Sequence, residues 1–240
     1  MSSLSDRIYG LIREDIISCV LPPGQSVTEG QLAESHGVGK APVRLALAAL
    51  SREGLVTAVP RQGHVVSEIT IESVNDVFGV RLIIEPANAR LAAGRVDAER
   101  LKALHSNLIK ENLALNVSQS KKVRRINRNP ASERRWLEAN NDFHLEIARA
   151  TGNERLVKIT ANILEESRRA VHLLFSVYDQ TEELRDDHPN LISTLAAGKA
   201  DEAAAVAREH IERTRRIVID ALLNNAAVRR VSTERGLSRP

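Results

Sequence analysis

Hydrophobic positions in the first 69 residues recur at helical spacing, interrupted by strong stop signals. The first stripe predicts a helix that ends at Pro22-Pro23-Gly24. Thr28 and Gln31 match a capping box, so a second helix is expected to begin at Thr28, and His36-Gly37 closes it after barely two turns. The first stripe consists of Ile8, Leu11, Ile12, Ile16 and Val20.

A third helix is expected to begin near Gly39-Lys40, with Pro42 in its first turn, and to end at Gly54. Two β-type runs follow at 55–59 and 64–67, joined by a turn over residues 60–63. This order is the outline of a winged helix-turn-helix, in which the third helix enters the major groove of DNA. The inner face of that helix is expected to be Val43, Ala46, Leu47 and Leu50.

The winged outline makes several polar residues candidates for DNA contact. Lys40 and Arg44 lie at the start of the third helix, where they can reach a phosphate or a guanine edge. Arg61, Gln62 and His64 are expected at the wing tip, beside the backbone or the minor groove. An ordinary solvated face is the alternative, because residues 1–69 hold six Lys and Arg against seven Asp and Glu.

From Ile71 onward the spacing is helical throughout, which predicts an all-helical domain over residues 70–228 after a DNA-binding domain over 1–69. Pro86 is expected to kink or restart the first of these helices. The basic segment 116–132 has few apolar anchors and is interpreted as a solvated connection, with a second nucleic-acid contact as the alternative. Residues 229–240 are expected to be a disordered tail. Further helices are predicted over 101–115, 136–151, 155–178, 187–198 and 201–225.

Three histidines lie on apolar stripes of three different predicted helices. His144 follows Asn140 by four residues, so the two share one face of a helix. His188 and His210 each lie among apolar positions of their own helices. Buried imidazoles need polar partners, and hydrogen bonds within the core would satisfy each separately. A divalent metal held between facing helices would satisfy all three together.

Composition limits the classes of protein that the chain can belong to. Hydrophobic residues make up 42% and charged residues 27% of the 240 residues, as in ordinary globular domains. Cys19 is the single cysteine, so no disulfide framework exists and a reducing compartment is expected. No apolar run approaches the roughly 20 residues that span a bilayer, and the charged N-terminus is unlike a secretory signal. A cytoplasmic protein is therefore expected.

The N-terminal part resembles the DNA-binding domain of GntR-family bacterial transcription regulators. The resemblance rests on Pro23-Gly24, on Pro42-Val43-Arg44 and on the run from Leu50 to Leu55. The family's usual Ser-Arg-Thr is replaced here by Gly39-Lys40-Ala41, and its Glu by Leu45, so two hydroxyls that often meet phosphates are absent. The resemblance implies DNA contacts from Lys40, Ala41, Arg44, Arg61, Gln62, Gly63 and His64.

The C-terminal part resembles the FCD type of helical ligand-binding domain, from the fatty-acid-regulator branch of the GntR family. The resemblance rests on Arg81 with Glu85-Pro86, on N-x-x-F-H followed by Gly152-Asn153, and on the two later histidines. It implies a metal at the floor of an effector pocket, with Zn the first choice and Ni, Co or Mn open. The metal ligands implied by position are Asn140, His144, His188 and His210.

Three neutral imidazoles and an amide oxygen leave the double charge of such an ion uncompensated, which favours a small carboxylate effector. Arg81 is expected either to clamp that carboxylate or to form a surface pair with Glu85. The chain is therefore expected to be a homodimeric repressor that binds a palindromic operator and responds to a small organic acid. A metal sensor and a metal-dependent hydrolase are the alternatives. No enzyme activity is expected, because Asp142, Asp187 and Glu209 should point off the ligand face.

Overall fold

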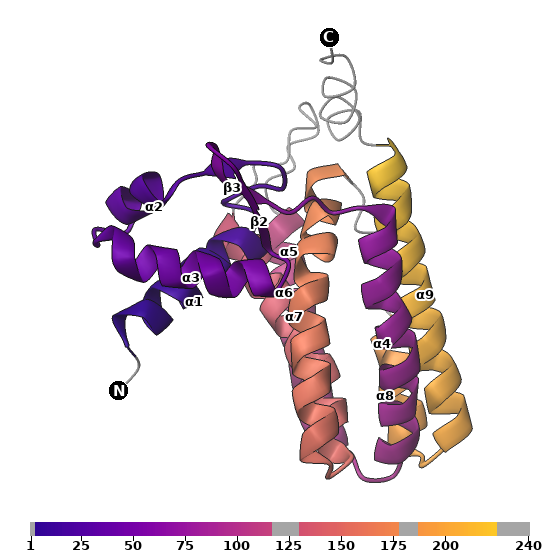
Figure 1. Cartoon of the computed structure of the whole chain (residues 1–240). Helices are drawn as coiled ribbons and strands as arrows, with labels where there is room; N and C mark the ends of the chain where they lie inside the picture. Colours follow the sequence, from indigo (N-terminus) through magenta and orange to yellow (C-terminus); the bar gives the residue numbers. More distant parts are fainter. Residues whose placement is uncertain (1–2, 117–129, 178–186, 225–240) are drawn as a thin grey trace. The chain divides into compact units, whose positions relative to one another are not determined.

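The computed structural model describes residues 3–116, 130–177 and 187–224 (Figure 1). Within these residues the chain separates into two compact units, with the division between Thr70 and Ile71. The first unit is a winged helix-turn-helix and the second is entirely helical, so the predicted fold class is confirmed. Most of the basic segment 116–132 and all of the tail 229–240 lie outside the described residues.

The N-terminal unit packs three helices against a small antiparallel sheet. The chain order is α1 Leu4–Ile17, β1 Ser26–Val27, α2 Glu29–Ser35, α3 Lys40–Arg52, β2 Val56–Val59 and β3 Gly63–Val66. The strand order is β1-β3-β2, with Ser26 opposite Val65 and Val56 opposite Val66. The predicted capping box of α2 is present, since the Thr28 side chain accepts a bond from the Gln31 backbone and Gln31 caps Thr28 in return.

Several details of the N-terminal prediction are wrong. α1 ends at Ile17, well before the prolines, and Cys19 takes a left-handed conformation with φ 54°. Leu11 and Val20 are 46% and 62% exposed, so they do not belong to the buried stripe. β1 was not expected, because two residues are too few to produce a periodic pattern. The predicted inner face of α3 is confirmed, as all four of its residues are buried.

The C-terminal unit consists, in its described part, of six helices. They are α4 Ile71–Ala92, α5 Ala98–Asn116, α6 Pro130–Ala150, α7 Glu154–Val177, α8 His188–Ala196 and α9 Ala200–Asn224. α4 lies beside α9 and also packs on α6 and α7, whereas α5 packs on α6 and α8 (Figure 1). The core between them is built around Phe143, Leu191 and Leu195.

The helix boundaries of this unit correct two expectations. α4 runs without interruption through Pro86, which is buried inside the helix, so of the two expected effects of this proline the restart is wrong. Packing of α4 on its neighbouring helices compensates for the one backbone donor that proline lacks. α6 begins at Pro130 rather than near Trp136. Among the described residues, no helix is long and apolar enough to span a bilayer.

Candidate metal centre and DNA-binding face

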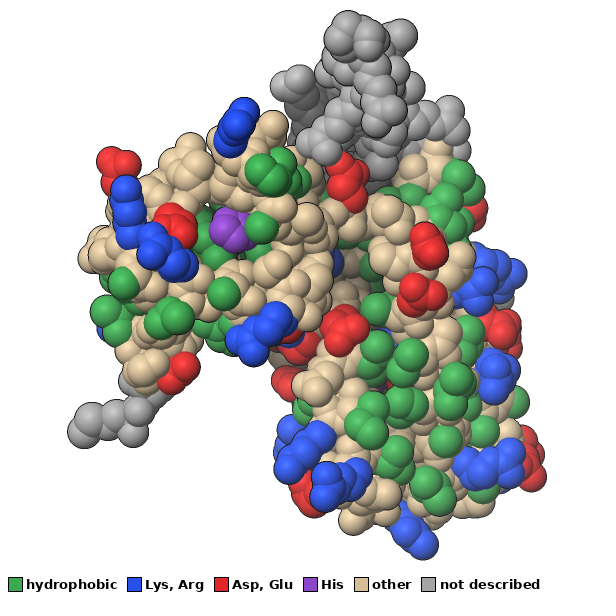
Figure 2. Space-filling view, in the orientation of Figure 1, with side chains coloured by type: hydrophobic (Ala, Val, Ile, Leu, Met, Phe, Trp, Pro, Cys, Tyr) green, Lys and Arg blue, Asp and Glu red, His purple; other side chains and the backbone are tan. Residues whose placement is uncertain are grey.

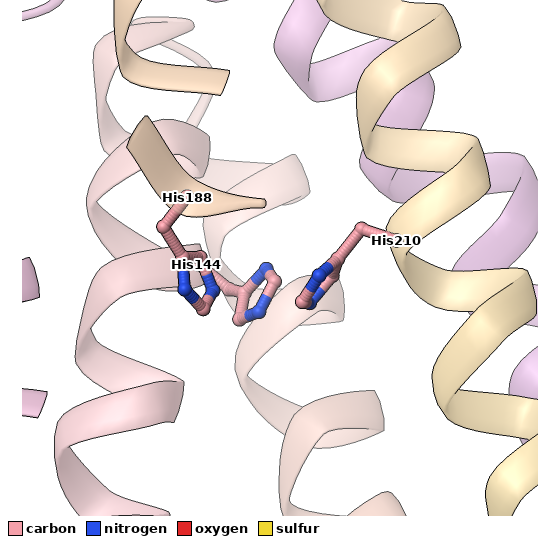
Figure 3. A group of neighbouring side chains, drawn as sticks. All are labelled: His144, His188 and His210. Atoms are coloured by element: carbon pink, nitrogen blue, oxygen red, sulfur yellow. The ribbon is translucent and has the colours of Figure 1, made fainter. Parts of the chain in front are cut away.

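The three predicted histidines converge between α6, α8 and α9 (Figure 3). Their ligand nitrogens all lie within 4.8 Å of one another. His144 and His188 are buried, and the His210 side chain is 14% exposed. Zn–N bonds of about 2.0–2.1 Å place two nitrogens on one ion about 3–4 Å apart, so the imidazoles need to approach by only about an ångström to share one.

A carboxylate on α4 orients one of these imidazoles. Oε2 of Glu85 lies 2.8 Å from Nδ1 of His144, and Nε of Arg81 donates to Oε1 of Glu85 at 2.6 Å. Glu85 engages Nδ1, and the buried Nε2 of His144 has no hydrogen-bond partner among the described residues. The ring of His144 lies in one cluster with those of His188 and His210 (Figure 3). A carboxylate that fixes the tautomer and leaves the other nitrogen as an acceptor is the usual support of a metal-bound histidine.

Protonation states also fit a metal ligand. Burial alone would raise the pKa of the Glu85 carboxyl, but Arg81 and His144 outweigh it and hold that pKa below its ordinary value. Burial lowers the pKa of the His144 imidazole, and Glu85 offsets this only in part. A neutral imidazole is the form of His144 that can bind a metal, and an ionised Glu85 can accept a hydrogen bond from its Nδ1.

Asn140 and Arg81 both line a cavity that opens beside the histidines. The cavity is partly open to solvent, and His188 and His210 belong to its wall. Arg81 is buried, with Nη1 3.4 Å from the Ser167 hydroxyl and the guanidinium over the Phe78 ring. The alternative expectation for Arg81 was a surface ion pair with Glu85. This pair forms, but it is buried inside the unit.

Three carboxylates near the histidines in sequence were expected to point away from the ligand face, and this expectation is wrong for one of them. Asp187 lies beside the cluster: its Oδ2 is 3.8 Å from Nδ1 of His210, and it also pairs with Arg213. Asp142 and Glu209 are exposed, and Glu209 Oε1 accepts from Arg213 at 3.0 Å. Asp187 precedes His188 in the chain, and only the packing of α8 on α9 brings it to His210.

Sequence reasoning missed the rest of the cavity wall. Arg213 and Thr214 lie three and four residues beyond His210, and Trp136 lies four residues before Asn140, so helical spacing from the predicted sites could have found them. One face of α5 supplies the remainder, with a single residue of α7. These residues are His105, Leu108, Ile109, Asn112 and Val171.

On the winged unit, the predicted contact residues of α3 are exposed on one face. Lys40, Ala41 and Arg44 all reach solvent, and Leu45, which was not predicted as a contact, is 61% exposed beside them. Basic side chains gather over the α2 and α3 end of this unit, with an acidic group and a histidine among them (Figure 2). Glu29 on α2 is the acidic partner of Arg44, through two bonds of 2.8 Å.

The wing turn is built on two left-handed residues. Arg61 has φ 64° and Gly63 has φ 90°, and Arg61 and Gln62 are exposed at the tip. A Cβ on Gly63 would lie 2.6 Å from the carbonyl oxygen of Val27, so only glycine fits there. His64 is not at the tip: it lies within β3, half-buried, opposite Ala58.

Comparison with known proteins matches both units to one class of regulator. Residues 4–66 match the bacterial regulatory proteins of the gntR family, and residues 76–213 match the FCD domain. The chain belongs to the GntR family, with an FCD domain. It is therefore a DNA-binding transcriptional regulator, as its family and its named relatives are.

The relatives are distant but extend over most of the chain. The HTH-type transcriptional repressor RspR of Escherichia coli (strain K12) is 23% identical over 209 residues, covering 87% of this chain and 86% of RspR. The Nta operon transcriptional regulator of Aminobacter aminovorans is 26% identical over 192 residues, covering 80% of this chain and 83% of that regulator.

Solved structures share the fold. Escherichia coli McbR/YncC superposes with a TM-score of 0.71 at 20% identity, covering 92% of this chain and 99% of that one. The Listeria monocytogenes regulator Lar gives a TM-score of 0.58 at 20% identity, covering 94% of this chain and 99% of the Lar chain.

Proposed function

We propose that this GntR regulator is a homodimeric, cytoplasmic repressor whose operator binding is modulated by a small carboxylic acid held over a divalent metal ion in the FCD unit. The observation that carries the proposal is the convergence of His144, His188 and His210, together with the buried Nε2 of His144, which has no hydrogen-bond partner within the described part of the chain. The repressor name of RspR supports the sign of regulation.

Asn140, His144, His188 and His210 would hold the metal, with Zn the first choice and Ni, Co or Mn as the alternatives. When bound, the ion would supply a positive centre for a carboxylate. Glu85 would keep the His144 imidazole oriented, and Asp187 would do the same for His210. Arg81, held by Glu85 at the cavity wall, would present its remaining donors to the acid.

In the winged unit, Lys40, Ala41 and Arg44 would face the major groove, and the wing residues would face the backbone or minor groove. The wing set is Arg61, Gln62, Gly63 and His64. Two copies of the unit would read a short palindrome. Bound acid would favour one arrangement of the two copies over another and so change operator affinity.

The test measures operator binding by fluorescence anisotropy, on an operator selected from random duplexes. We expect zinc-loaded protein to change its affinity when carboxylic acids are added, and EDTA-treated protein to lose this response. Asn140→Asp adds a charged ligand, so it should bind zinc more tightly and the acid more weakly. A response to zinc alone, unaffected by any acid, would make the protein a metal sensor instead.

A further inference from the structure

The cavity beside the histidines changes its chemistry along its length. α5 and α6 run antiparallel, because Arg100 pairs with Glu146 at 2.8 Å and Arg135 pairs with Glu111 at 3.0 Å. The ring of His105 lies beside that of His188, with centroids 5.7 Å apart. Moving along α5 from His105 therefore leads away from the metal centre, to Leu108 and Ile109, and then to the level of Trp136 on α6.

Beyond His105, in the direction away from the histidine cluster, the cavity wall is mainly apolar. Leu108, Ile109 and Val171 line it together with the indole of Trp136, and Asn112 is the polar residue at the far end. A ligand whose anionic group lies at the histidines would place the rest of its body against these side chains. Burial of hydrocarbon there is favourable, whereas a second carboxylate would lose its hydration against an apolar surface.

The arginines of the wall are already matched by carboxylates. Arg81 is bound by Glu85, and Arg213 is bound by Asp187 and Glu209. Among the described residues that line the cavity, neither guanidinium therefore contributes an uncompensated charge. The unbalanced positive charge of the site would be that of the metal, at one end of the cavity.

We infer that the effector is a monocarboxylic acid with an apolar body, aliphatic or aromatic, rather than a hydroxy acid or a di- or tricarboxylic acid. This inference rests on the proposed function and specifies the chemical class of its ligand. The carboxylate would lie at the histidine end, and the hydrocarbon would lie along Ile109, Leu108 and Trp136.

The chain carries its own probe for this arrangement, since Trp136 is its single tryptophan. Zinc-reconstituted full-length protein is titrated with acetate, hexanoate, succinate and citrate by calorimetry and by tryptophan emission. Each buried methylene should tighten Kd about fourfold, so hexanoate should bind at least tenfold more tightly than acetate or succinate. Hexanoate should also shift the Trp136 emission, and acetate should not.

Two isoleucines provide a matched pair of variants. Ile109 in the cavity wall and Ile159 on α7 are 42% and 46% exposed, so asparagine is tolerable at both. Ile109→Asn should weaken hexanoate at least fivefold without changing acetate or zinc binding, and Ile159→Asn should change none of them. Tighter binding of succinate or citrate than of hexanoate overturns the inference alone. Zinc binding without binding of any acid overturns the effector proposal as well.

A second inference comes from the winged unit, and it depends on a different observation. Glu29 holds the guanidinium of Arg44 by one edge: Nε donates to Oε1 and Nη2 donates to Oε2, both at 2.8 Å. The Arg44 side chain is nevertheless 69% exposed. An exposed ion pair contributes little to stability, so its main consequence is the direction in which Arg44 points.

The edge that Glu29 leaves open has the geometry of a base reader. With Nε and one hydrogen of Nη2 engaged, Arg44 keeps both hydrogens of Nη1 and one of Nη2. Those donors at the end of the guanidinium form the fork that binds O6 and N7 of guanine. Glu29 also adds a negative charge where phosphates would approach. Its hydrogen bonds to Arg44, and then the nearby His64 and Lys40, hold the pKa of the Glu29 carboxyl below its ordinary value, so this charge is present at neutral pH.

We propose that Glu29 is a positioning residue that directs Arg44 to a guanine and so raises specificity at the expense of general affinity for DNA. The full-length protein carrying Glu29→Gln is compared with wild type on the selected operator and on random duplex. Glu34→Gln is the matched control, an exposed glutamate on the same helix.

Glu29→Gln should bind random duplex a few-fold more tightly, and its ratio of operator to random affinity should fall about tenfold. Single guanine-to-adenine substitutions in the operator, which replace the O6 acceptor, locate the guanine that Arg44 distinguishes in wild type and no longer distinguishes in Glu29→Gln. Glu34→Gln should preserve the ratio. An unchanged ratio in Glu29→Gln, or an equal fall in operator and random binding, overturns the positioning role.

Discussion

Oε2 of Glu85 lies 2.8 Å from Nδ1 of His144, so a carboxylate on α4 fixes which nitrogen of a histidine on α6 carries the proton. Glu85 is at the same time the partner of the buried Arg81. One side chain therefore connects the histidine cluster to the arginine of the cavity wall, and a change at either of these two places should affect the other.

Replacement of Glu85 should affect both functions of this connection. Glu85→Gln removes the charge that supports His144, so zinc affinity should fall about 10–100-fold. It also leaves Arg81 without its carboxylate, which should destabilise the metal-free unit by roughly 3–5 kcal/mol. Competition with a fluorescent chelator and thermal melts measure the two effects. Glu138→Gln, at an exposed position of α6, is the control, and equal zinc affinity in both variants would exclude a role for Glu85 in the site.

Removal of metal should destabilise the wild type more than the histidine variants. A ligand that binds only the folded state stabilises it by about 2.7 kcal/mol at a hundredfold excess over Kd. EDTA should therefore lower the Tm of the wild type and have little effect on His144→Ala or His210→Ala. Elemental analysis after reconstitution with Zn, Ni, Co and Mn measures occupancy. Substoichiometric metal with an unmoved melting curve would mean that the three histidines are core residues.

The lowered pKa of His144 gives metal-free protein a predictable pH dependence. Burial disfavours the charged imidazole in the folded state, so the unfolded chain binds more protons once the pH falls below about 6.5. Stability should therefore decrease as the pH falls from about 6.5 towards the folded pKa, and should be insensitive to His144 above that window. Chemical denaturation of wild type and His144→Gln in EDTA between pH 5 and 8 measures it. If the free energy of unfolding changed with pH in the same way in both proteins, the lowered pKa of His144 would be contradicted.

Arg44 should be a principal contact to the operator. Arg44→Ala should weaken operator binding by roughly 1–3 kcal/mol if the side chain reads a base, and should relax discrimination at one position. Gel-shift titration against operator and mismatched duplexes measures both. Arg52→Ala, in the last turn of α3, is the control. Unchanged affinity in folded Arg44→Ala would remove this residue from the interface.

The wing turn should tolerate no side chain at Gly63. A Cβ there would meet the carbonyl oxygen of Val27 at 2.6 Å, and φ 90° is strained for any other residue. Gly63→Val should displace the wing and reduce operator affinity at least tenfold, while zinc binding by the FCD unit is retained. Footprinting combined with zinc titration measures both properties. A normal footprint would contradict the wing assignment.

The sequence by itself determined the elements of the N-terminal unit and the spacing of the histidines within their helices. A capping box and an apolar stripe are local features, and the bounds of α2 and the buried face of α3 followed from them. Because each residue turns a helix by about 100°, periodicity also placed Asn140 and His144 on one face. Where the local signal was weak, as at the end of α1 and in the two-residue β1, the prediction failed.

Only the tertiary structure decided which side chains meet across helices. Periodicity determines the angle of a residue around its own axis, but the axial offset between two helices depends on how their surfaces pack. The contact of Glu85 with His144, the approach of Asp187 to His210 and the pairing of Arg44 with Glu29 all depend on that offset. The same packing kept α4 continuous through a proline that local rules would have treated as a break, because burial against neighbouring helices outweighs the loss of one backbone hydrogen bond.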